Sequence, residues 1–329
     1  MFIHITGTGS CLPEKVVTND ELSMRLNTTD EWIFSHTGIH SRHIAAPDEC
    51  TSDLAVCAAK KALEDSGVTP DQLGMIIVAS SSSDYLGFPT VSCLVQEALG
   101  AKQAGVLDVQ AACTGFIYAM QVARGLMQFD PRPTLVIGAE TMSRVVDWSD
   151  RNTCILFGDG AGAAVLEGKE TPGGIRDAIL KGDGTGSGMI FRAGGVRAVP
   201  AEQGKLPFLR MNGRAVFNFA VKIFDEVLSA LVQRSKLVLN DLAQIIPHQA
   251  NARIVEATAR RMKVPLSSFF MNMETTGNTS AASIPIALDV LNKTGKLKAG
   301  DLLATVGFGA GLTYGGLLMQ WTKPLLQHA

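Results

Sequence analysis

Short apolar runs alternate with amphipathic segments along the whole chain. The run 75–79 is apolar at every position, which is typical of a strand covered on both faces, and a similar strand is predicted at 134–138. Apolar residues recur at helical spacing at about 52–65 and again at 91–99. Strands that alternate with helices predict an α/β protein with a largely parallel sheet.

The second half of the chain repeats this order. Residues 240–246 resemble residues 71–77, and each segment leads into an Ile-Ile pair. Further predicted elements are helices at 215–237, 252–262 and 280–291 and a strand at 301–307. This weak duplication predicts two equivalent domains, residues 1–172 and 173–329, joined through the glycine-rich stretch 173–195. Because the Ile-Ile strands take equivalent places, their ends are expected to converge on one cleft.

The amino-terminal residues 1–7 predict a first strand, since no basic region is followed there by a long apolar segment of the signal-peptide type. Two short helices are expected to begin near Thr18 and Thr28, and 80–88 is expected to be a loop. No run approaches the roughly 18 apolar residues that a membrane-spanning helix needs. We therefore expect a cytoplasmic protein without a membrane partner.

Composition limits the partners further. Lys+Arg number 29 and Asp+Glu 31, so the net charge of -2 provides no basic field for a nucleic acid. A chain of 329 residues exceeds one ordinary core, and 46% hydrophobic residues suggest extensive burial that includes a subunit contact. The six cysteines are irregularly spaced and are expected to be reduced thiols: Cys11, Cys50, Cys57, Cys93, Cys113 and Cys154.

Cys113 is the first candidate for chemistry. It follows the β-branched run that ends at Val109, and beyond it Phe116, Met120 and Ala123 recur at helical spacing. The cysteine is therefore predicted at a strand-to-helix turn, where the partial positive charge of a helix N-terminus favours the thiolate. A buried cysteine that packs as a small hydrophobe is an equally good interpretation of this segment alone.

Partners for a cysteine nucleophile are expected in the second half. His248 follows the predicted strand at 245–246, which places it where α/β sheets bind ligands, although a structural histidine would fit as well. Asn278 comes after Gly277 at a helix start, where an ordinary helix cap would look the same. The small residues at 307–316 follow a strand and would let backbone N–H groups approach a substrate oxygen.

Four separated motifs in this order resemble the β-ketoacyl-acyl-carrier-protein synthase III family, the initiating condensing enzymes of bacterial fatty acid synthesis. The similarity extends from Gly7-Thr8-Gly9 nearly to the end of the chain. The motifs are Ala111-Ala112-Cys113, Pro247-His248-Gln249-Ala250-Asn251, Gly277-Asn278-Thr279-Ser280-Ala281-Ala282-Ser283 and Phe308-Gly309-Ala310-Gly311. The resemblance implies a thiolase fold, with duplicated α/β halves in a layered α-β-α-β-α core, and a homodimer.

The resemblance also implies a reaction. Cys113 would take an acyl group from an acyl-CoA substrate, most often acetyl-CoA, with no further cofactor and no metal. Malonyl on an acyl carrier protein would then lose carbon dioxide, and the resulting carbanion would attack the acyl-cysteine. His248 and Asn278 would donate hydrogen bonds to the enolate oxygen, and the backbone N–H groups of Cys113 and Ala310 would form the oxyanion hole.

Family contacts to CoA carry over onto seven positions: Thr28, Trp32, Arg151, Gly213, Phe217, Asn251 and Phe308. Trp32 and Arg151 could sandwich an adenine between an indole and a guanidinium plane. His36 stands where the family often has an arginine, which predicts a weaker grip on the nucleotide. The spacing of His36, His40 and His43 fits a solvated face better than a metal site, because no cysteine or acidic cluster accompanies them.

Two further assignments concern protein partners. Phe88 resembles the family residue that closes the acyl pocket of the partner subunit, and plain interface packing is its alternative. Arg253 matches the family's carrier-binding arginine, and Arg260 and Arg261 extend a docking surface for an acidic carrier protein. A merely solvated helix face is the alternative there, and Asn218 stands where relatives can have a lysine.

Some residues that other enzymes of this superfamily require are absent from the sequence. Degradative thiolases use a second cysteine in the carboxyl half and elongating synthases a second histidine; here no cysteine follows Cys154, and only His328 follows His248. A related Cys-His-Asn condensing enzyme that uses a longer acyl-CoA or serves polyketide or quinolone synthesis stays open. A cysteine hydrolase and a noncatalytic binding protein are the alternatives from other classes.

The glycine-rich stretch 158–162 looks like a dinucleotide-binding motif, but a strand rather than a helix is predicted after it. Tight turns are therefore predicted for this stretch instead.

Overall fold

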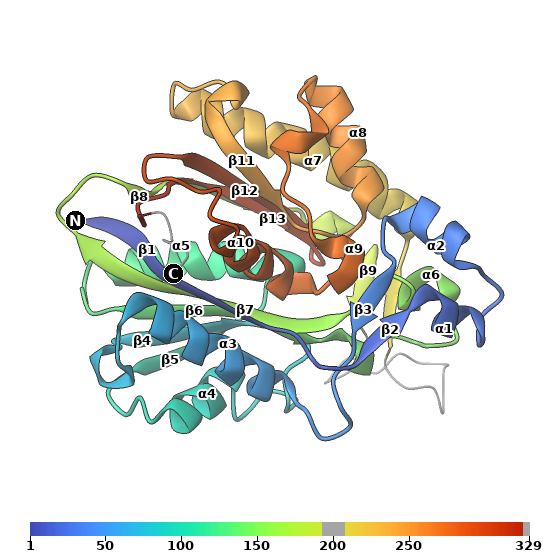
Figure 1. The fold of residues 1–329 in the computed structure, drawn as a ribbon, viewed down its shortest axis with the longest axis horizontal. Coiled ribbons are helices and arrows are strands. Elements are labelled where there is room, and N and C mark those ends of the chain that lie inside the picture. The colour runs from blue at the N-terminus through green and yellow to red at the C-terminus, as the bar shows by residue number, and fades with distance from the viewer. Residues whose placement is uncertain (193–207, 325–329) are drawn as a thin grey trace.

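The structure is a computed structural model that describes residues 1–192 and 208–324. Two mixed β-sheets lie one above the other with helices between them (Figure 1). The five-stranded sheet contains, in spatial order, β1 (Phe2–Cys11), β7 (Asp159–Lys169), β6 (Thr134–Thr141), β4 (Met75–Ala79) and β5 (Gly105–Val109). The four-stranded sheet contains β11 (Leu242–Pro247), β12 (Leu302–Gly309), β13 (Thr313–Gln320) and β8 (Gly174–Gly182).

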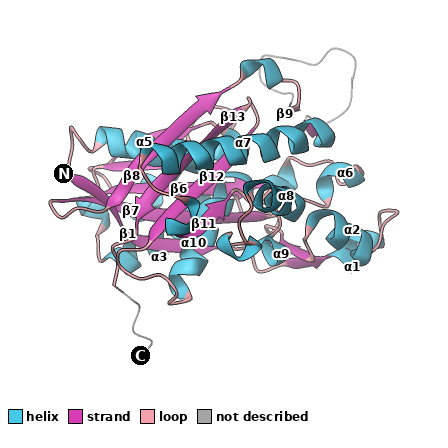
Figure 2. Cartoon of the chain, turned by 90° about the horizontal axis from the view of Figure 1, so that it is seen from above, coloured by secondary structure: helices cyan, strands magenta, loops and turns pink. Residues whose placement is uncertain are grey.

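Helices form three layers around the two sheets. α3 (Thr51–Ser66) and α4 (Val91–Leu99) cover the outer face of the five-stranded sheet. α7 (Gly213–Arg234) lies across β12 and β13 on the outer face of the other sheet, with α8 (Ala252–Met262) beside it (Figure 2). α5 (Gly115–Leu126) and α10 (Ser283–Lys293) contact both sheets from the middle layer. The expected thiolase fold with α-β-α-β-α layers is confirmed.

The middle layer unites the two halves in one core. Phe116, Ile117 and Met120 of α5 are almost completely buried and belong to a cluster that includes Val136 of β6 and Leu303 of β12. A fully buried side chain of this size contributes about 1.5–3 kcal/mol through burial alone. The helix that follows Cys113 is therefore held by strands from both halves of the sequence.

The remaining short elements gather at one end of the molecule, on the right of Figure 1. They are β2 (Val16–Thr18), α1 (Asn19–Ser23), α2 (Asp30–Thr37), β3 (Ser41–His43), α6 (Arg151–Cys154), β9 (Ile190–Arg192), β10 (Leu209–Met211) and α9 (Met273–Thr276). Within the described ranges, no helix combines the length and the apolar character needed to cross a bilayer.

The internal repeat extends to the strand order. Spatially, β1-β7-β6-β4 in one sheet corresponds to β8-β13-β12-β11 in the other, with the same sequence of antiparallel and parallel pairings. The prediction of a largely parallel sheet is wrong, because β7 and β13 run antiparallel to both of their neighbours. Only residues 310–312 separate β12 from β13, and so short a connection permits antiparallel pairing alone.

Two expectations about individual residues are also wrong. Cys11 and Cys57 form a disulfide, because β1 lies against α3 and brings their Cα atoms to 5.8 Å; Cys50, Cys93, Cys113 and Cys154 are free. Of the glycine-rich stretch 158–162, all but Gly158 lies inside β7 rather than in tight turns. Its glycines admit a neighbouring helix: a Cβ at Gly162 would lie 2.5 Å from the backbone nitrogen of Ile286 in α10.

Candidate active site

The sharp turn at Cys113 has a counterpart in the second half. Short 3-10 turns at Ala112–Thr114 and Ser280–Ala282 lead into α5 and α10. Each begins with a non-glycine residue in the left-handed region, Ala112 at φ 46° and Ser280 at φ 49°. The predicted strand-to-helix position of Cys113 is confirmed, and the two turns face each other: the Cys113 thiol donates to Ser280 Oγ at 3.4 Å.

The ionisation expected for Cys113 is not what its surroundings favour. Cys113 is partly exposed because it lines a cavity, but protein atoms surround its thiol. This burial is the largest influence and raises the pKa of Cys113 to about 12; the Ser280 hydroxyl acts in the opposite direction, and the nearby Glu140 carboxylate adds to the rise. The thiol, rather than the thiolate predicted from the helix N-terminus, is the resting form.

His248 lies just beyond the end of β11 and is almost completely buried. Its backbone N–H donates to the Val306 carbonyl of β12 at 2.7 Å, and its Nδ1 lies 2.7 Å from Ser283 Oγ at the start of α10. Ser283 Oγ accepts the Gln249 N–H at 3.5 Å, so we assign its hydroxyl proton to His248 Nδ1, which leaves Nε2–H as a donor. Burial lowers the pKa of His248 to about 3 and keeps the ring neutral.

Asn278 is fixed by both its backbone and its side chain. Its N–H donates to the Leu156 carbonyl at 2.8 Å, and its Oδ1 accepts the Ser280 N–H at 2.9 Å. Because the amide oxygen is occupied in this way, the Nδ2 group is the part of the side chain that can donate to a ligand. Asn278 and His248 thus offer two neutral hydrogen-bond donors.

One cavity of about 350 Å³ brings the predicted catalytic residues together. Cys113, His248, Asn278 and Ala310 all line it. Gly309 at the end of β12 allows this approach, since a Cβ there would lie 2.7 Å from the Cys113 backbone nitrogen. The sequence prediction that these residues converge from both halves of the chain is borne out by this geometry, while their chemical roles stay predictions.

Most of the residues expected to contact CoA line the same cavity: Trp32, Gly213, Phe217, Asn251 and Phe308. His36 lines it too, stacked on Trp32 with ring centroids 4.2 Å apart. Arg151 does not line the cavity but lies over the Trp32 ring at 4.5 Å. An adenine therefore cannot enter between these two groups unless Arg151 moves. Thr28 lies outside the cavity lining, and its hydroxyl is buried without a hydrogen-bond partner.

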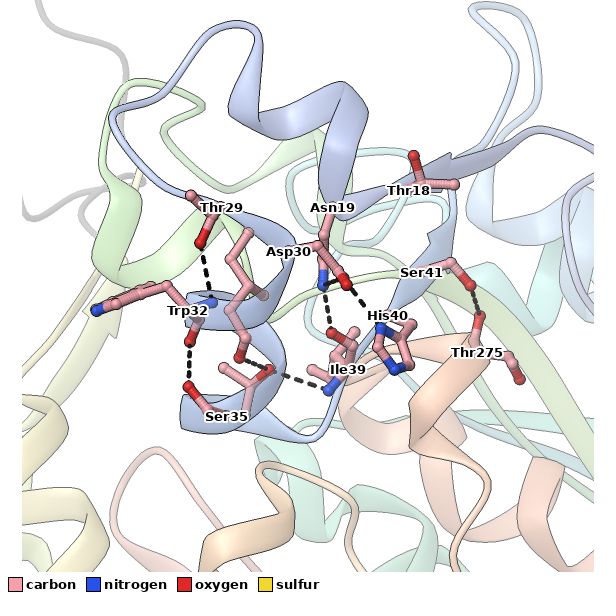
Figure 3. A network of polar contacts seen from close by, with 12 residues as sticks. Thr18, Asn19, Thr29, Asp30, Trp32, Ser35, Ile39, His40, Ser41 and Thr275 are labelled. Atoms are coloured by element: carbon pink, nitrogen blue, oxygen red, sulfur yellow. Dashed lines mark hydrogen bonds and ion pairs between the residues drawn. The ribbon is translucent and has the colours of Figure 1, made fainter.

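A polar network holds the helix that carries Trp32 (Figure 3). Thr29 Oγ1 accepts the Trp32 N–H at 3.1 Å and so caps α2. The Asn19 amide group donates to Asp30 at 2.8 Å and to the Ile39 carbonyl at 2.6 Å, while His40 Nδ1 lies 3.0 Å from Asp30. Among the described residues, no group of three potential metal ligands occurs, near His36, His40 and His43 or elsewhere.

The residues assigned to protein partners lie at the surface. Phe88 is 88% exposed and does not line the cavity of its own chain. Arg253 is exposed at the start of α8 and has no ion-pair partner among the described residues. Arg260 pairs with Glu256 at 3.9 Å, and Arg261 pairs with Asp225 of α7 at 2.6 Å. The three arginines are therefore not equivalent, because two of them are already partly neutralised.

Three polar residues next to the site were not singled out from the sequence: Glu140, Ser280 and Ser283. Ser280 and Ser283 lie within a motif that the sequence analysis quotes, but nothing in the motif says which atoms they contact. The sequence contains one indication of Glu140, because this acidic residue directly follows the uncharged strand-like run 134–139. β6 is buried at every position, and a carboxylate in such a strand needs hydrogen-bond donors around it. An acidic residue at this place therefore indicates a buried polar network.

A duplicated, layered α/β fold with cysteine, histidine and asparagine on one cavity is typical of thiolase-fold condensing enzymes of the Cys-His-Asn type. The comparisons agree with this class. The 3-oxoacyl-[acyl-carrier-protein] synthase III model matches residues 107–184, and the model of the family's C-terminal part matches residues 232–321. The beta-ketoacyl-[acyl-carrier-protein] synthase III of Caldanaerobacter subterraneus subsp. tengcongensis is 45% identical over 324 residues, which cover 97% of this chain and 98% of that protein.

Solved structures give the same result. The 3-oxoacyl-[acyl-carrier-protein] synthase III of Aquifex aeolicus VF5 has a TM-score of 0.91 and 39% identity, covering 97% of this chain and 100% of its own. The priming beta-ketosynthase of the R1128 polyketide pathway has a TM-score of 0.92 and 36% identity, covering 98% of this chain and 97% of its own. The chain belongs to the β-ketoacyl-[acyl-carrier-protein] synthase III family, and it is an acyltransferase of the condensing type.

Proposed function

We propose that the enzyme condenses an acyl-CoA primer, most often acetyl-CoA, with malonyl-acyl carrier protein through an acyl-Cys113 intermediate. The observation that carries this proposal is the single cavity lined by Cys113, His248, Asn278 and Ala310. The family's part in initiating fatty acid synthesis agrees with it. The CoA thioester is a substrate, and no cofactor enters the mechanism.

In the first half-reaction the Cys113 sulfur attacks the thioester carbonyl. Negative charge develops on the carbonyl oxygen, and the backbone N–H groups of Cys113 and Ala310 are the donors proposed to hold it. Collapse of this intermediate releases the CoA thiolate and leaves the acyl group on Cys113. Trp32, Phe217 and Phe308 line the cavity that would hold the pantetheine arm and its nucleotide end.

In the second half-reaction malonyl on its carrier loses carbon dioxide. The enolate oxygen that forms needs hydrogen-bond donors, and His248 Nε2–H and Asn278 Nδ2 are neutral donors fixed by Ser283 and Ser280. The carbanion then attacks the acyl-cysteine, and the carbon–sulfur bond to Cys113 breaks. Two preorganised donors of this kind typically provide about 10²–10³-fold each in rate.

The proposal includes partners. The loop after β4 exposes Tyr85, Leu86 and Phe88, and Leu107 is exposed on β5, the edge strand of the larger sheet. Exposed apolar side chains beside an open strand edge favour association, so we infer a homodimer in which Phe88 closes the acyl pocket of the other subunit. Arg253 would dock the acidic carrier protein. A cytoplasmic location follows from CoA thioesters being intracellular metabolites.

Intact-protein mass spectrometry after brief exposure to acetyl-CoA, and separately to octanoyl-CoA, tests the acyl-enzyme. We expect an acetyl adduct on wild type and none of comparable stoichiometry on Cys113→Ser, since a serine hydroxyl is a far weaker nucleophile at neutral pH. An adduct from octanoyl-CoA alone would keep the mechanism but assign the enzyme to a specialised role such as the priming of polyketide synthesis. Release of free acid faster than condensation would indicate a hydrolase, and no adduct from either donor would reject the proposal.

A further inference from the structure

The buried Cys113 thiol must lose its proton to an acceptor when its sulfur attacks the acyl donor. Placing a bare thiolate in a dry cavity is costly because burial disfavours charge. His248 is a poor candidate, since in the assigned tautomer Nδ1 accepts the Ser283 hydroxyl proton and Nε2 already carries a proton. The Cys113 S–H group points instead to Ser280 Oγ, 3.4 Å away.

Behind Ser280 lies a completely buried carboxylate, Glu140 of β6. Ser280 Oγ accepts the Cys113 S–H at 3.4 Å, and the Ser280 hydroxyl lies close enough to Glu140 to lower the pKa of that carboxyl group. The Ser81 N–H donates to both carboxylate oxygens of Glu140 at 3.1 Å, and the Ala281 N–H, next to Ser280, donates to one of them at 3.4 Å. Residues from both halves of the chain therefore meet at this carboxylate.

The hydroxyl groups of two neighbouring serines, Ser82 and Ser80, also donate to Glu140. Ser82 Oγ accepts the Thr141 N–H at 2.8 Å, so its own proton is free for Glu140, 2.5 Å away. Ser80 Oγ accepts the Ser82 N–H and also donates to Glu140, at 3.5 Å. Burial is the largest influence on Glu140 and raises its pKa, while the surrounding donors act in the opposite direction and favour the carboxylate as a hydrogen-bond acceptor.

We propose that Glu140 accepts the Cys113 proton through the Ser280 hydroxyl when Cys113 attacks the acyl donor. The proposed path runs from Cys113 S–H to Ser280 Oγ, 3.4 Å away, and on from the Ser280 hydroxyl to the Glu140 carboxylate, which accepts the N–H of the adjacent Ala281 at 3.4 Å. The transfer moves one negative charge from Glu140 to Cys113 and adds none to the site. This inference rests on Cys113 being the nucleophile, as proposed above.

The electrons and protons balance over the cycle. As the Cys113 sulfur bonds to the acyl carbon, Ser280 takes its proton and passes its own to Glu140, while the carbon–sulfur bond of CoA breaks. The CoA thiolate leaves with the electron pair and is protonated by water at the cavity mouth. When the carbanion later displaces Cys113, Glu140 returns the proton through Ser280 and is ionised again.

Other titratable groups lie around this pair. Among the described residues, His248 just beyond β11, His36 of α2 and Arg192 of β9 line the cavity together with Cys113. α5 and α10 place no acidic residue in their first turns, and the loop after β4 contributes the uncharged Ser80, Ser81 and Ser82. Glu140 is the charged side chain that shifts the pKa of Cys113, so the pH dependence of Cys113 reactivity should report on Glu140, with His248 as the alternative acceptor.

Alkylation by iodoacetamide tests the relay without any acyl substrate, so it stays informative if the condensation assay fails. The rate at Cys113 is measured by peptide mass spectrometry from pH 6 to 8, with the exposed Cys50 as an internal reference in the same molecule. An internal acceptor makes the thiolate fraction independent of pH, so we expect a plateau for wild type. A thiol that loses its proton to bulk water instead reacts tenfold faster with each pH unit.

Glu140→Gln and Ser280→Ala should both convert the plateau into this tenfold rise and slow alkylation at pH 7 by about 10²-fold, a typical effect of losing a positioned acid–base group. Ser280→Ala keeps the buried carboxylate and supplies the test if Glu140→Gln does not fold. Asp159→Asn is the matched control, because it removes the charge of another buried carboxylate, which accepts hydrogen bonds from Ala45 and Ser143. This variant should keep the pH-independent alkylation rate of wild type.

Faster rather than slower alkylation of Cys113 in Glu140→Gln would contradict the relay. If Glu140 acts on Cys113 only through its charge, Glu140→Gln removes a repulsion that raises the pKa of the thiol and must speed alkylation. A wild-type rate that already rises tenfold per pH unit would also contradict the proposal. Loss of the plateau in His248→Gln together with its survival in Glu140→Gln would make the imidazole the acceptor instead.

Discussion

At the residue scale, burial sets the protonation states of the site. It raises the pKa of Cys113 to about 12 and lowers the pKa of His248 to about 3, so both side chains are neutral at pH 7. The sequence motif around Cys113 identified its strand-to-helix turn but not its ionisation. The walls that exclude water come from residues far along the chain, such as Phe308 and Asn278, and no local pattern contains that information.

The neutrality of His248 predicts a stability effect with a definite sign. Its pKa is about 3 in the folded protein against 6.5 for an unperturbed histidine, so between these values the unfolded state binds more protons. The stabilisation is complete above pH 6.5 and is lost as pH falls toward 3. Chemical denaturation at pH 7 and pH 5 should therefore show a larger loss of unfolding free energy for wild type than for His248→Gln.

His4 provides the control for this comparison. It is also buried, but both of its ring nitrogens have hydrogen-bond partners, Thr322 Oγ1 and the Thr171 carbonyl, each at 2.9 Å. A His4→Gln variant should retain the wild-type loss of stability between pH 7 and pH 5 that His248 causes. Equal pH dependence in wild type and His248→Gln would mean that His248 is already protonated or accessible to water in the folded state.

At the element scale, the predictions succeeded where a segment determines its own structure. The amphipathic helix at 252–262 and the loop at 80–88 needed only local spacing and turn residues. β13 was missed because glycines interrupt its apolar run, and its strand conformation is fixed by pairing with β12 and β8. The Cys11–Cys57 disulfide was missed for the same reason, since it depends on how β1 packs against α3.

The arginines of α8 differ in a way that only packing reveals. Arg261 is held by Asp225 of α7, whereas Arg253 is free of ion pairs among the described side chains. We expect Arg253→Glu to raise the KM for the malonyl-carrier substrate by about tenfold and to leave acyl loading from CoA intact, since a like charge would repel the acidic carrier. Steady-state kinetics of the two half-reactions measure this.

Arg260→Glu on the same helix is the matched control. Its guanidinium already interacts with Glu256, so its reversal should raise the carrier KM less than reversal of Arg253 does. If Arg253→Glu lowered the rates of both half-reactions equally, this arginine would stabilise the fold or lie at the cavity mouth instead of docking the carrier. Equal effects of the two reversals would mean that the helix face acts only through its total charge.

At the scale of the whole molecule, the duplication explains why one site needs both halves. The first half provides Cys113 and Glu140, and the second half provides His248, Asn278 and Ser280. The repeat was visible in the sequence because each half repeats the same order of elements. The contact between the two turns at Cys113 and Ser280 was not, because it follows from stacking two sheets around α5 and α10.

In the proposed mechanism, the first half of the chain carries the acyl group and the second half provides the donors that discharge it. The most direct test is the intact mass of the enzyme after loading with acetyl-CoA and then after a chase with malonyl-carrier, for wild type and Asn278→Ala. Wild type should gain the acetyl adduct and lose it within the chase. Asn278→Ala should gain the same adduct and retain it, because it keeps the nucleophile but lacks a donor for the enolate. Discharge of the Asn278→Ala adduct at the wild-type rate, or an adduct that does not form on Cys113, would contradict the account.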